Sequence, residues 1–432
     1  MSDGSNKKRL SILLINNYFP PEIGAASHLY YYLAKELLKR GHEVTVLTGI
    51  ARYNVDKSVY NYYLEKLKNN KYYSEIIEGI KVIRVKLPFV ERNQLFRRGI
   101  EHFEIALKLF KYSKSSLKNV DVSLVYSPPL TLYWTAKKIR KLTGAPYILN
   151  VQDLFPQYAI DLGVLKNKFI ISFFKNIEKK AYSSADLITV HSENNKKYVN
   201  DITDKQEKIV VIENWIDNNL ITPGSKNNEF AIENQLTDKF VVSFAGTLGF
   251  AQDIEIIIKT ANELKDYNEI VFVIVGDGVK KSESQMLIEK YNLKNIVMLP
   301  TVTKEKYPLV LHSSDISLAT LHKNVKTPVV PSKILSIMSA GKPVLATMNL
   351  DGDAPELIKK AECGYVFEAG DSKSLANAIL RLYQNEELRK KLGENGRKYI
   401  EEHLSVRTAA EKSEKLFAEV INKNNKTNQE KR

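Results

Sequence analysis

The sequence contains a single cysteine and lacks a long apolar run. With only Cys363, the chain cannot form an intramolecular disulfide or a cysteine cluster for zinc or iron–sulfur. Low cysteine content is typical of a cytoplasmic protein. The longest uncharged run lies between Asp121 and Lys137, and Pro128-Pro129 interrupts it. Because a membrane-spanning helix needs about 18 or more apolar residues, we expect none. We expect no signal peptide either.

Common cofactor and nucleic-acid signatures are also missing. The sequence has no G-x-G-x-x-G fingerprint and no G-x-x-x-x-G-K-[ST] loop, which argues against nicotinamide or flavin binding and against P-loop ATP hydrolysis. It has neither zinc-finger spacing nor the aromatic signature of an RNA-binding domain. Asp351-Gly352-Asp353 has the letters of a metal-binding pair, but its place between a strand and a helix favours a solvated turn. We therefore expect no cofactor, no metal ion and no nucleic-acid partner.

The length of 432 residues predicts two domains, since a single hydrophobic core stops growing near ~250–300 residues. Short apolar runs alternate with helical patterns in both halves, which is typical of parallel sheets covered on both faces. We predict an α/β fold with two doubly wound Rossmann-like domains. Ligands of such domains bind beyond the carboxyl ends of the strands, so we expect a central cleft. The predicted segments are an N-terminal domain over 1–218, a C-terminal domain over 219–403, a returning helix over 404–422 and a flexible tail over 423–432.

Positive charge is concentrated in the first half of the chain. Residues 1–218 carry 34 basic and 22 acidic residues, whereas residues 219–432 carry 30 and 28. Within the first half, segment 92–118 combines basic residues with apolar residues at helical spacing. Such a helix packs on the domain core or lies on an anionic membrane surface. Both interpretations stay open, and they allow a cytoplasmic protein bound peripherally to the inner face of the cell membrane.

Two loops after predicted strands of the first half are candidate binding sites. In the loop Asn17–Ala25, Gly24 precedes a helix whose free N–H groups suit an anion or a sugar hydroxyl. Asp153 follows the apolar strand Tyr147–Asn150, where a carboxylate can accept a proton or orient a hydroxyl. The alternative role for Asp153 is to cap the next helical turn.

Two segments of the second half favour phosphate binding. Gly246 and Gly249 flank Thr247-Leu248 after a strand, and their backbone N–H groups suit a phosphate. Pro331, Ser332 and Lys333 begin a predicted helix. A cation at a helix N-terminus opposes the helix dipole by about 0.3–1 kcal/mol. An anionic ligand would remove that conflict, so Lys333 is a candidate phosphate contact, with a solvated lysine as the alternative.

In this order, the loops resemble the retaining GT-B glycosyltransferases of family GT4. Three features carry the resemblance over about residues 9–420: Phe19-Pro20-Pro21-Glu22-Ile23-Gly24 with Gly41-His42-Glu43-Val44; Phe244-Ala245-Gly246-Thr247-Leu248-Gly249; and Pro331-Ser332-Lys333 through Ala340-Gly341-Lys342-Pro343-Val344. The sequence is most similar to the bacterial surface-polysaccharide branch that includes N-acetyl-fucosamine transferases.

The resemblance implies a UDP-sugar donor on the second domain and an acceptor on the first. It implies catalysis by Asp153 and acceptor binding by Phe19, Glu22 and Ala25. The implied donor-binding residues are Gly24, Gly246, Thr247, Gly249, Ser332, Lys333 and Glu356. The sequence departs from the family pattern at four places. Ala25 stands at the second position of the family's Gly-Gly loop, and Gln152 replaces a histidine. The family's two glutamates fall near Pro328 and Ser336, where neither residue is acidic. Ser332, Lys333 or Glu356 would then replace the usual ribose contact.

These observations favour a retaining glycosyltransferase that moves a sugar, an N-acetylated hexosamine or deoxyhexosamine, from a UDP-sugar to a lipid-linked or saccharide acceptor. Capsule or O-antigen synthesis is the process that the resemblance implies. Two alternatives stay open. One is a GT-B sugar-nucleotide epimerase, which needs no acceptor. The other is a non-catalytic basic protein that binds nucleotides or nucleic acid, for which the missing glutamates are the best support.

Overall fold

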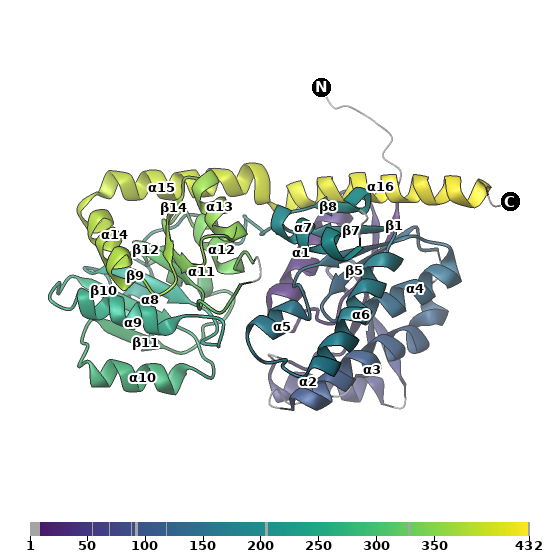
Figure 1. Cartoon of the computed structure of the whole chain (residues 1–432), viewed down its shortest axis with the longest axis horizontal. Helices are drawn as coiled ribbons and strands as arrows, with labels where there is room; N and C mark the ends of the chain where they lie inside the picture. The colour runs from purple at the N-terminus through teal and green to yellow at the C-terminus, as the bar shows by residue number, and fades with distance from the viewer. Residues whose placement is uncertain are drawn as a thin grey trace, which may run out of the picture. The chain divides into compact units, whose positions relative to one another are not determined.

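The computed structural model describes residues 9–53, 55–68, 70–87, 89–90, 94–117, 119–203, 206–326 and 329–430. The chain forms two compact units (Figure 1). Unit 1 comprises residues 1–156, 167–214 and 406–432, and unit 2 comprises residues 157–166 and 215–405. The main division thus falls between Asn214 and Trp215, close to the predicted boundary at 218. Within the described residues, no helix has the length and apolar character required to cross a bilayer.

Unit 1 is built on a sheet of eight described strands in the order β3-β4-β2-β1-β5-β6-β7-β8. All neighbours are parallel except β3 and β4. The strands are β1 Ser11–Ile15, β2 Glu43–Gly49, β3 Tyr72–Ile77, β4 Ile80–Val85, β5 Val122–Ser127, β6 Tyr147–Val151, β7 Leu187–Val190 and β8 Ile209–Val211. The helices are α1 Ala25–Lys39, α2 Lys57–Leu67, α3 Leu95–Ser113, α4 Leu132–Thr143, α6 Lys168–Ser184, α7 Glu193–Thr203 and α16 Val406–Glu430.

Unit 2 is built on a six-stranded parallel sheet in the order β11-β10-β9-β12-β13-β14. The strands are β9 Phe240–Ala245, β10 Ile270–Val275, β11 Ile296–Leu299, β12 Ile316–Thr320, β13 Val344–Met348 and β14 Gly364–Glu368. The helices are α5 Gln157–Asp161, α8 Glu229–Glu233, α9 Ile254–Glu263, α10 Lys281–Lys290, α11 Tyr307–His312, α12 Ser332–Ser339, α13 Asp353–Lys360, α14 Ser372–Gln384 and α15 Glu386–Tyr399. In both units the strand order reverses beside the first strand, and ligands of doubly wound sheets bind at such a point.

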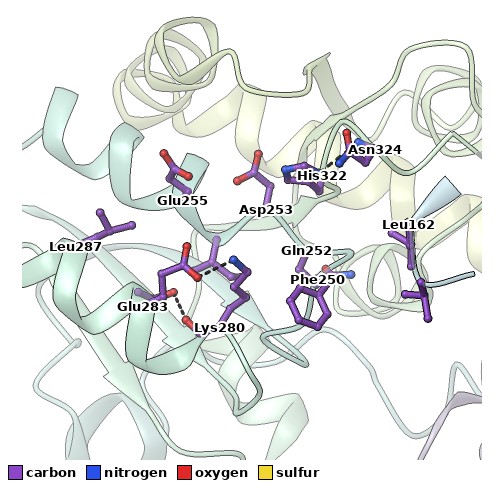
Figure 2. A pocket seen from close by; sticks show the side chains of 13 residues that line it. Leu162, Phe250, Gln252, Asp253, Glu255, Lys280, Glu283, Leu287, His322 and Asn324 are labelled. Atoms are coloured by element: carbon purple, nitrogen blue, oxygen red, sulfur yellow. Dashed lines mark hydrogen bonds and ion pairs between the residues drawn. The ribbon is translucent and has the colours of Figure 1, made fainter. Parts of the chain in front are cut away.

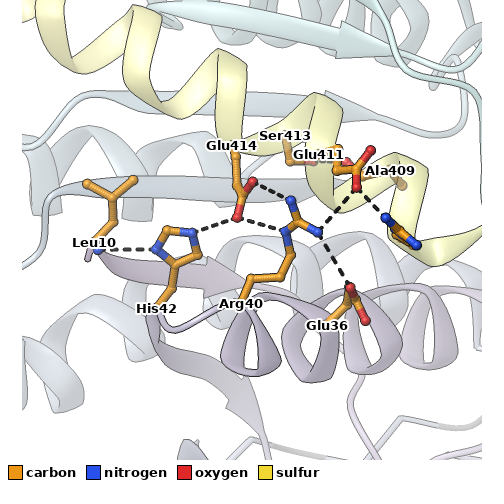
Figure 3. Close-up of polar contacts among 9 residues, drawn as sticks. Leu10, Glu36, Arg40, His42, Ala409, Glu411, Ser413 and Glu414 are labelled. Atoms are coloured by element: carbon orange, nitrogen blue, oxygen red, sulfur yellow. Dashed lines mark hydrogen bonds and ion pairs between the residues drawn. The ribbon is translucent and has the colours of Figure 1, made fainter. Parts of the chain in front are cut away.

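The last helix, α16, packs on unit 1 through a polar cluster at the end of α1 (Figure 3). The Arg40 guanidinium donates to both carboxylate oxygens of Glu414, at 2.8 and 2.9 Å. His42 Nδ1 accepts from the Leu10 N–H at 3.2 Å, which leaves Nε2 to donate to Glu414 at 2.9 Å. The helix continues to Glu430, so the predicted helix end at 422 and flexible tail from 423 are corrected.

Candidate functional site

The first loop of unit 2 follows β9 and contacts the loop that follows β10. The Gly246 N–H donates to Val275 O, and the Leu248 N–H donates to Asp277 O, each at 2.9 Å. A Cβ on Gly276 would lie 1.9 Å from Gly246 O, and one on Gly278 would lie 2.4 Å from Leu248 O. Neither position has room for a side chain. These glycines let the two loops approach closely, which holds the segment 246–249 in place.

Helix α12 brings Lys333 to the same loop. Ile334, Leu335, Ile337 and Met338 of this helix are buried in unit 2, and that packing fixes the orientation of its first turn. The Lys333 Nζ lies 3.8 Å from the centre of the Phe244 ring and donates to Gln252 Oε1. A Cβ on Gly246 would lie 3.3 Å from the same Nζ. The lysine predicted to contact phosphate is therefore beside the glycine loop predicted to cradle it.

The Lys333 ammonium has no carboxylate within ion-pair distance among the described residues. Burial alone lowers its pKa to about 7. An unpaired buried ammonium is costly, and an anionic ligand compensates that cost. The neighbouring Ser332 and Thr247 are exposed, and Gly249 is partly buried. The structure thus brings four predicted donor-binding residues, Gly246, Thr247, Gly249 and Lys333, into one loop–helix junction, with Ser332 at its exposed rim.

Gln252, which the sequence pattern did not single out, links this junction to a pocket of about 350 Å³. Figure 2 shows charged and polar side chains around it, among them Asp253, Lys280, Glu283 and His322. Phe250 contributes a ring that is 64% exposed. The contact between Lys333 and Gln252 joins positions 81 residues apart, so no local pattern could have indicated it.

Glu356 lies in the first turn of α13 and is exposed. No contact that the structure describes joins it to Lys333 or to the loop 246–249. Of the two positions where the family has glutamates, Ser336 lies on α12 and Pro328 lies outside the described residues. Among the described residues, no cluster of three His, Cys, Asp or Glu side chains could hold a metal ion. A ribose contact by Glu356 stays a prediction.

In unit 1, Asp153 follows β6 at the carboxyl edge of the sheet. Burial raises the pKa of its carboxyl to about 6. The next helix, α5, begins only at Gln157, and none of the hydrogen bonds described for this part of the chain shows the Asp153 carboxylate capping it. The capping alternative therefore has no support in the structure. A partly buried carboxyl with a pKa near neutrality is suited to proton transfer.

Beside Asp153 lies a buried polar chain that the sequence pattern did not reveal. The Asn150 amide donates to Thr189 Oγ1, and the Gln152 amide donates to Asn150 Oδ1, both at 3.0 Å. His191 Nε2 lies 2.9 Å from Gln152 O. Asn150 lies near the end of an apolar strand and His191 follows another, and polar residues at the ends of adjacent parallel strands are the signal that could have identified them. These hydrogen bonds fix the position of Gln152, which stands where the family has histidine.

The predicted acceptor loop has a structural role at two of its residues. Phe19 is completely buried and makes an edge contact with Tyr31, at 6.0 Å between ring centres. The Glu22 carboxylate is also buried and accepts from the backbone N–H groups of Arg52 and Tyr53, at 2.9 and 3.0 Å. Burial raises its pKa, against the opposing charge of Arg52. Both side chains are thus covered by their own unit, and acceptor binding by Phe19 and Glu22 stays a prediction.

Gly24 and Ala25 remain candidates at this loop. Gly24 precedes α1 as its N-cap residue and is partly buried, and Ala25 is exposed in the first turn. The predicted basic segment 92–118 forms α3 and a short 3₁₀ turn. Residues 92, 93 and 118 lie outside the described part of the chain. Its inner side chains, including Ile105 and Leu109, are in the core of unit 1, which confirms the core-packing interpretation for that side of the helix.

Comparisons with known proteins match both halves of the chain to glycosyltransferases. A family model described as "Glycosyltransferase Family 4" matches residues 24–220, and one described as "Glycosyl transferases group 1" matches residues 225–399. A probable glycosyltransferase, WbjE, of Pseudomonas aeruginosa is 27% identical over 68% of this chain and 74% of its own length. An N-acetylgalactosaminyltransferase of Campylobacter jejuni, which acts on a diphospho-undecaprenol-linked saccharide, is 28% identical over 52% of this chain and 56% of its own.

The fold is that of solved glycosyltransferases. The structure of Anabaena HepE in complex with UDP superposes with a TM-score of 0.68 at 16% identity, over 95% of this chain and all of the other. This chain has two largely parallel α/β sheets in succession and a final helix that belongs to the first unit. The predicted fold class is confirmed. The chain therefore belongs to the glycosyltransferases of group 1 and family 4, and it has the GT-B fold.

Proposed function

We propose that the chain transfers an N-acetylated hexosamine or deoxyhexosamine from a UDP-sugar to a lipid-linked or saccharide acceptor, with retention at the anomeric carbon. The process we propose is surface polysaccharide synthesis. The relatives support this choice, since one of them is named for transfer of N-acetylgalactosamine to a lipid-linked saccharide. The proposal also covers the N-acetyl-fucosamine branch of the family.

The observation that carries the proposal is the Lys333 ammonium. It lies partly buried against Phe244 and beside Gly246, in the absence of a described carboxylate partner. The Gly246 and Leu248 N–H groups already donate to Val275 O and Asp277 O. A diphosphate placed beside the ammonium would accept hydrogen bonds from Nζ, from the Thr247 and Gly249 N–H groups and from the start of α12. These donors would stabilise the negative charge that develops on UDP as the glycosidic bond breaks. In this proposal the leaving group needs no metal ion.

Two residues carry further parts of the proposal. Asp153, with its pKa near neutrality, takes the proton of the acceptor hydroxyl or holds a hydroxyl of the donor sugar. Ser332 or Glu356 contacts the ribose, because the usual glutamate position holds Ser336. Gly24 and Ala25 hold the start of α1 close to the acceptor or the donor phosphate.

The test is a binding and turnover panel. Calorimetry with UDP, GDP and ADP should show selective binding of UDP, and UDP release should be fastest with UDP-N-acetylhexosamines in the presence of a lipid-linked saccharide. The anomeric configuration of the product, read by NMR, tests retention. UDP release without acceptor, together with an epimerised UDP-sugar, would favour an epimerase instead. Binding to DNA without affinity for any nucleotide sugar would overturn the proposal.

A further inference from the structure

Helix α6 of unit 1 presents phenylalanine side chains to solvent. Phe169 is 87% exposed and Phe173 is 52% exposed. They are four residues apart on one helix and therefore lie on the same face. Later in the helix, Ile177 and Ala181 are buried in the core. Isolated exposed apolar residues are common in proteins, but contiguous patches of them mark interaction sites. The question is therefore whether these two side chains stand alone.

The exposed apolar surface continues onto α3. The ring of Phe103 lies 6.0 Å from that of Phe173, between centres. Ile100 and Leu107 lie one turn before and one turn after Phe103, and both are exposed. We call this surface the α3–α6 face and define it by Ile100, Phe103, Leu107, Phe169 and Phe173. The contact between Phe103 and Phe173 joins the part of this face on α3 to the part on α6.

The charges around the α3–α6 face are positive. Between residues 165 and 184 the sequence has five lysines and one acidic residue, Glu178. Glu178 is buried and accepts from the hydroxyls of Tyr182 and Tyr198, at 3.2 and 3.1 Å. Lys180 lies seven residues, about two turns, after Phe173 on α6, and Lys111 lies four residues after Leu107 on α3. Both lysines are exposed.

The acidic residue of α3 nearest to this face is compensated. Glu104 forms ion pairs with Arg97 at 2.6 Å and with Lys108 at 3.4 Å. The α3–α6 face thus combines exposed aromatic side chains with exposed lysines and with carboxylates that are buried or paired. A second copy of the same basic face would repel it, which disfavours a symmetric contact between copies.

We propose that the α3–α6 face docks the protein onto an anionic lipid bilayer. The phenylalanines enter the boundary between headgroups and acyl chains, and the lysines contact anionic headgroups. The proposal moves the centre of the membrane contact from segment 92–118 to the first turns of α6. It extends the proposed use of a lipid-linked acceptor but does not depend on the identity of the donor.

Sedimentation of the full-length chain with vesicles tests this proposal. We expect binding to phosphatidylcholine vesicles that contain phosphatidylglycerol, weak binding to phosphatidylcholine alone, and a decrease with rising salt. Phe169→Ser combined with Phe173→Ser should lower the partition coefficient by about ten-fold or more. The matched control combines Ile76→Ser with Ile232→Ser, which are 68% and 66% exposed elsewhere, and should bind like the wild type.

The charge contribution is tested with two pairs of variants that lose the same net charge. Lys111→Gln with Lys180→Gln should lower binding by about five-fold per lysine, whereas Lys265→Gln with Lys373→Gln, exposed in unit 2, should have little effect. An equal loss in both pairs would mean attraction by net charge alone and would overturn the proposal. So would wild-type protein that stays in the supernatant, or a phenylalanine variant that binds as well as the wild type.

Two further measurements distinguish membrane docking from self-association and from loss of the fold. Light scattering on the phenylalanine variant reports whether the face instead holds a second copy, and loss of self-association with unchanged vesicle binding would overturn the proposal. Melting temperature and UDP affinity, which we expect to be unchanged in all variants, show that the units remain folded. A wild-type chain that binds vesicles but not UDP would contradict the proposed donor and leave the membrane proposal standing.

Discussion

Replacement of Lys333 by alanine should weaken UDP binding strongly. The side chain is partly buried beside Gly246 and over the Phe244 ring, and its one described hydrogen bond goes to a neutral amide oxygen of Gln252. A charge-assisted hydrogen bond contributes about 1.5–3 kcal/mol, so the Kd for UDP should rise by about ten- to 150-fold.

Lys342→Ala is the matched control. This lysine follows the end of α12 and donates to His312 O at 2.9 Å. Burial lowers its pKa to about 8, so it resembles Lys333 in chemistry and burial but lies at the opposite end of the same helix. The UDP affinity of this variant should stay within a few-fold of the wild-type value. Calorimetry on both variants measures the difference, and equal affinities would refute the assignment of the phosphate site.

The pH dependence of UDP binding gives an independent check. Burial lowers the pKa of Lys333 to about 7 in the free protein, and a bound diphosphate would raise it by charge attraction. The protonated form then binds best. Affinity should be constant below pH 7 and should fall by up to about ten-fold per pH unit above it, with proton uptake on binding. Lys333→Ala should remove this slope. A wild-type affinity that stays constant across pH 7 would show that the ammonium does not contact the ligand.

Three other predictions concern different parts of the chain. Asp153→Asn should lower turnover by about 10²–10⁴-fold without a loss of UDP affinity or melting temperature. Wild-type turnover should rise as pH increases through about 6, where Asp153 ionises. A fully active variant would remove Asp153 from catalysis. Gly276→Ala should prevent the close approach to Gly246 O and reduce both melting temperature and UDP affinity, so a variant with wild-type values would contradict the loop packing. Glu414→Gln should cost about 1–3 kcal/mol of stability by weakening the pairing with Arg40 and His42, measured by urea unfolding, while UDP affinity stays unchanged.

Apolar runs predicted the central strands well. The predicted strand Tyr147–Asn150 is β6 to within one residue, because a strand buried on both faces must be apolar at nearly every position. The edge strand β3, Tyr72–Ile77, and the preceding helix α2 were missed. The side chains of β3 are half-buried or exposed, so its sequence lacks the continuous apolar signal. The tail beyond residue 422 reads as polar, yet α16 continues through it because a helix can extend into solvent once its first turns are packed.

The loops with candidate chemistry could be located from sequence, but not the partners of their side chains. Strand ends and helix starts are local patterns, and they correctly placed Asp153 and Gly246 just after strands and Lys333 in the first turn of a helix. Whether Lys333 meets an acid or the Gln252 amide depends on a contact across 81 residues, and the burial of Glu22 depends on the backbone of Arg52 and Tyr53. Similarly, periodicity shows that α6 is amphipathic, but only its packing against α4 decides that Phe169 stays exposed while Ile177 is buried. Local sequence determines the spacing of apolar residues along a helix or strand. Which residues pack against each of its faces is decided by segments that are distant in the chain.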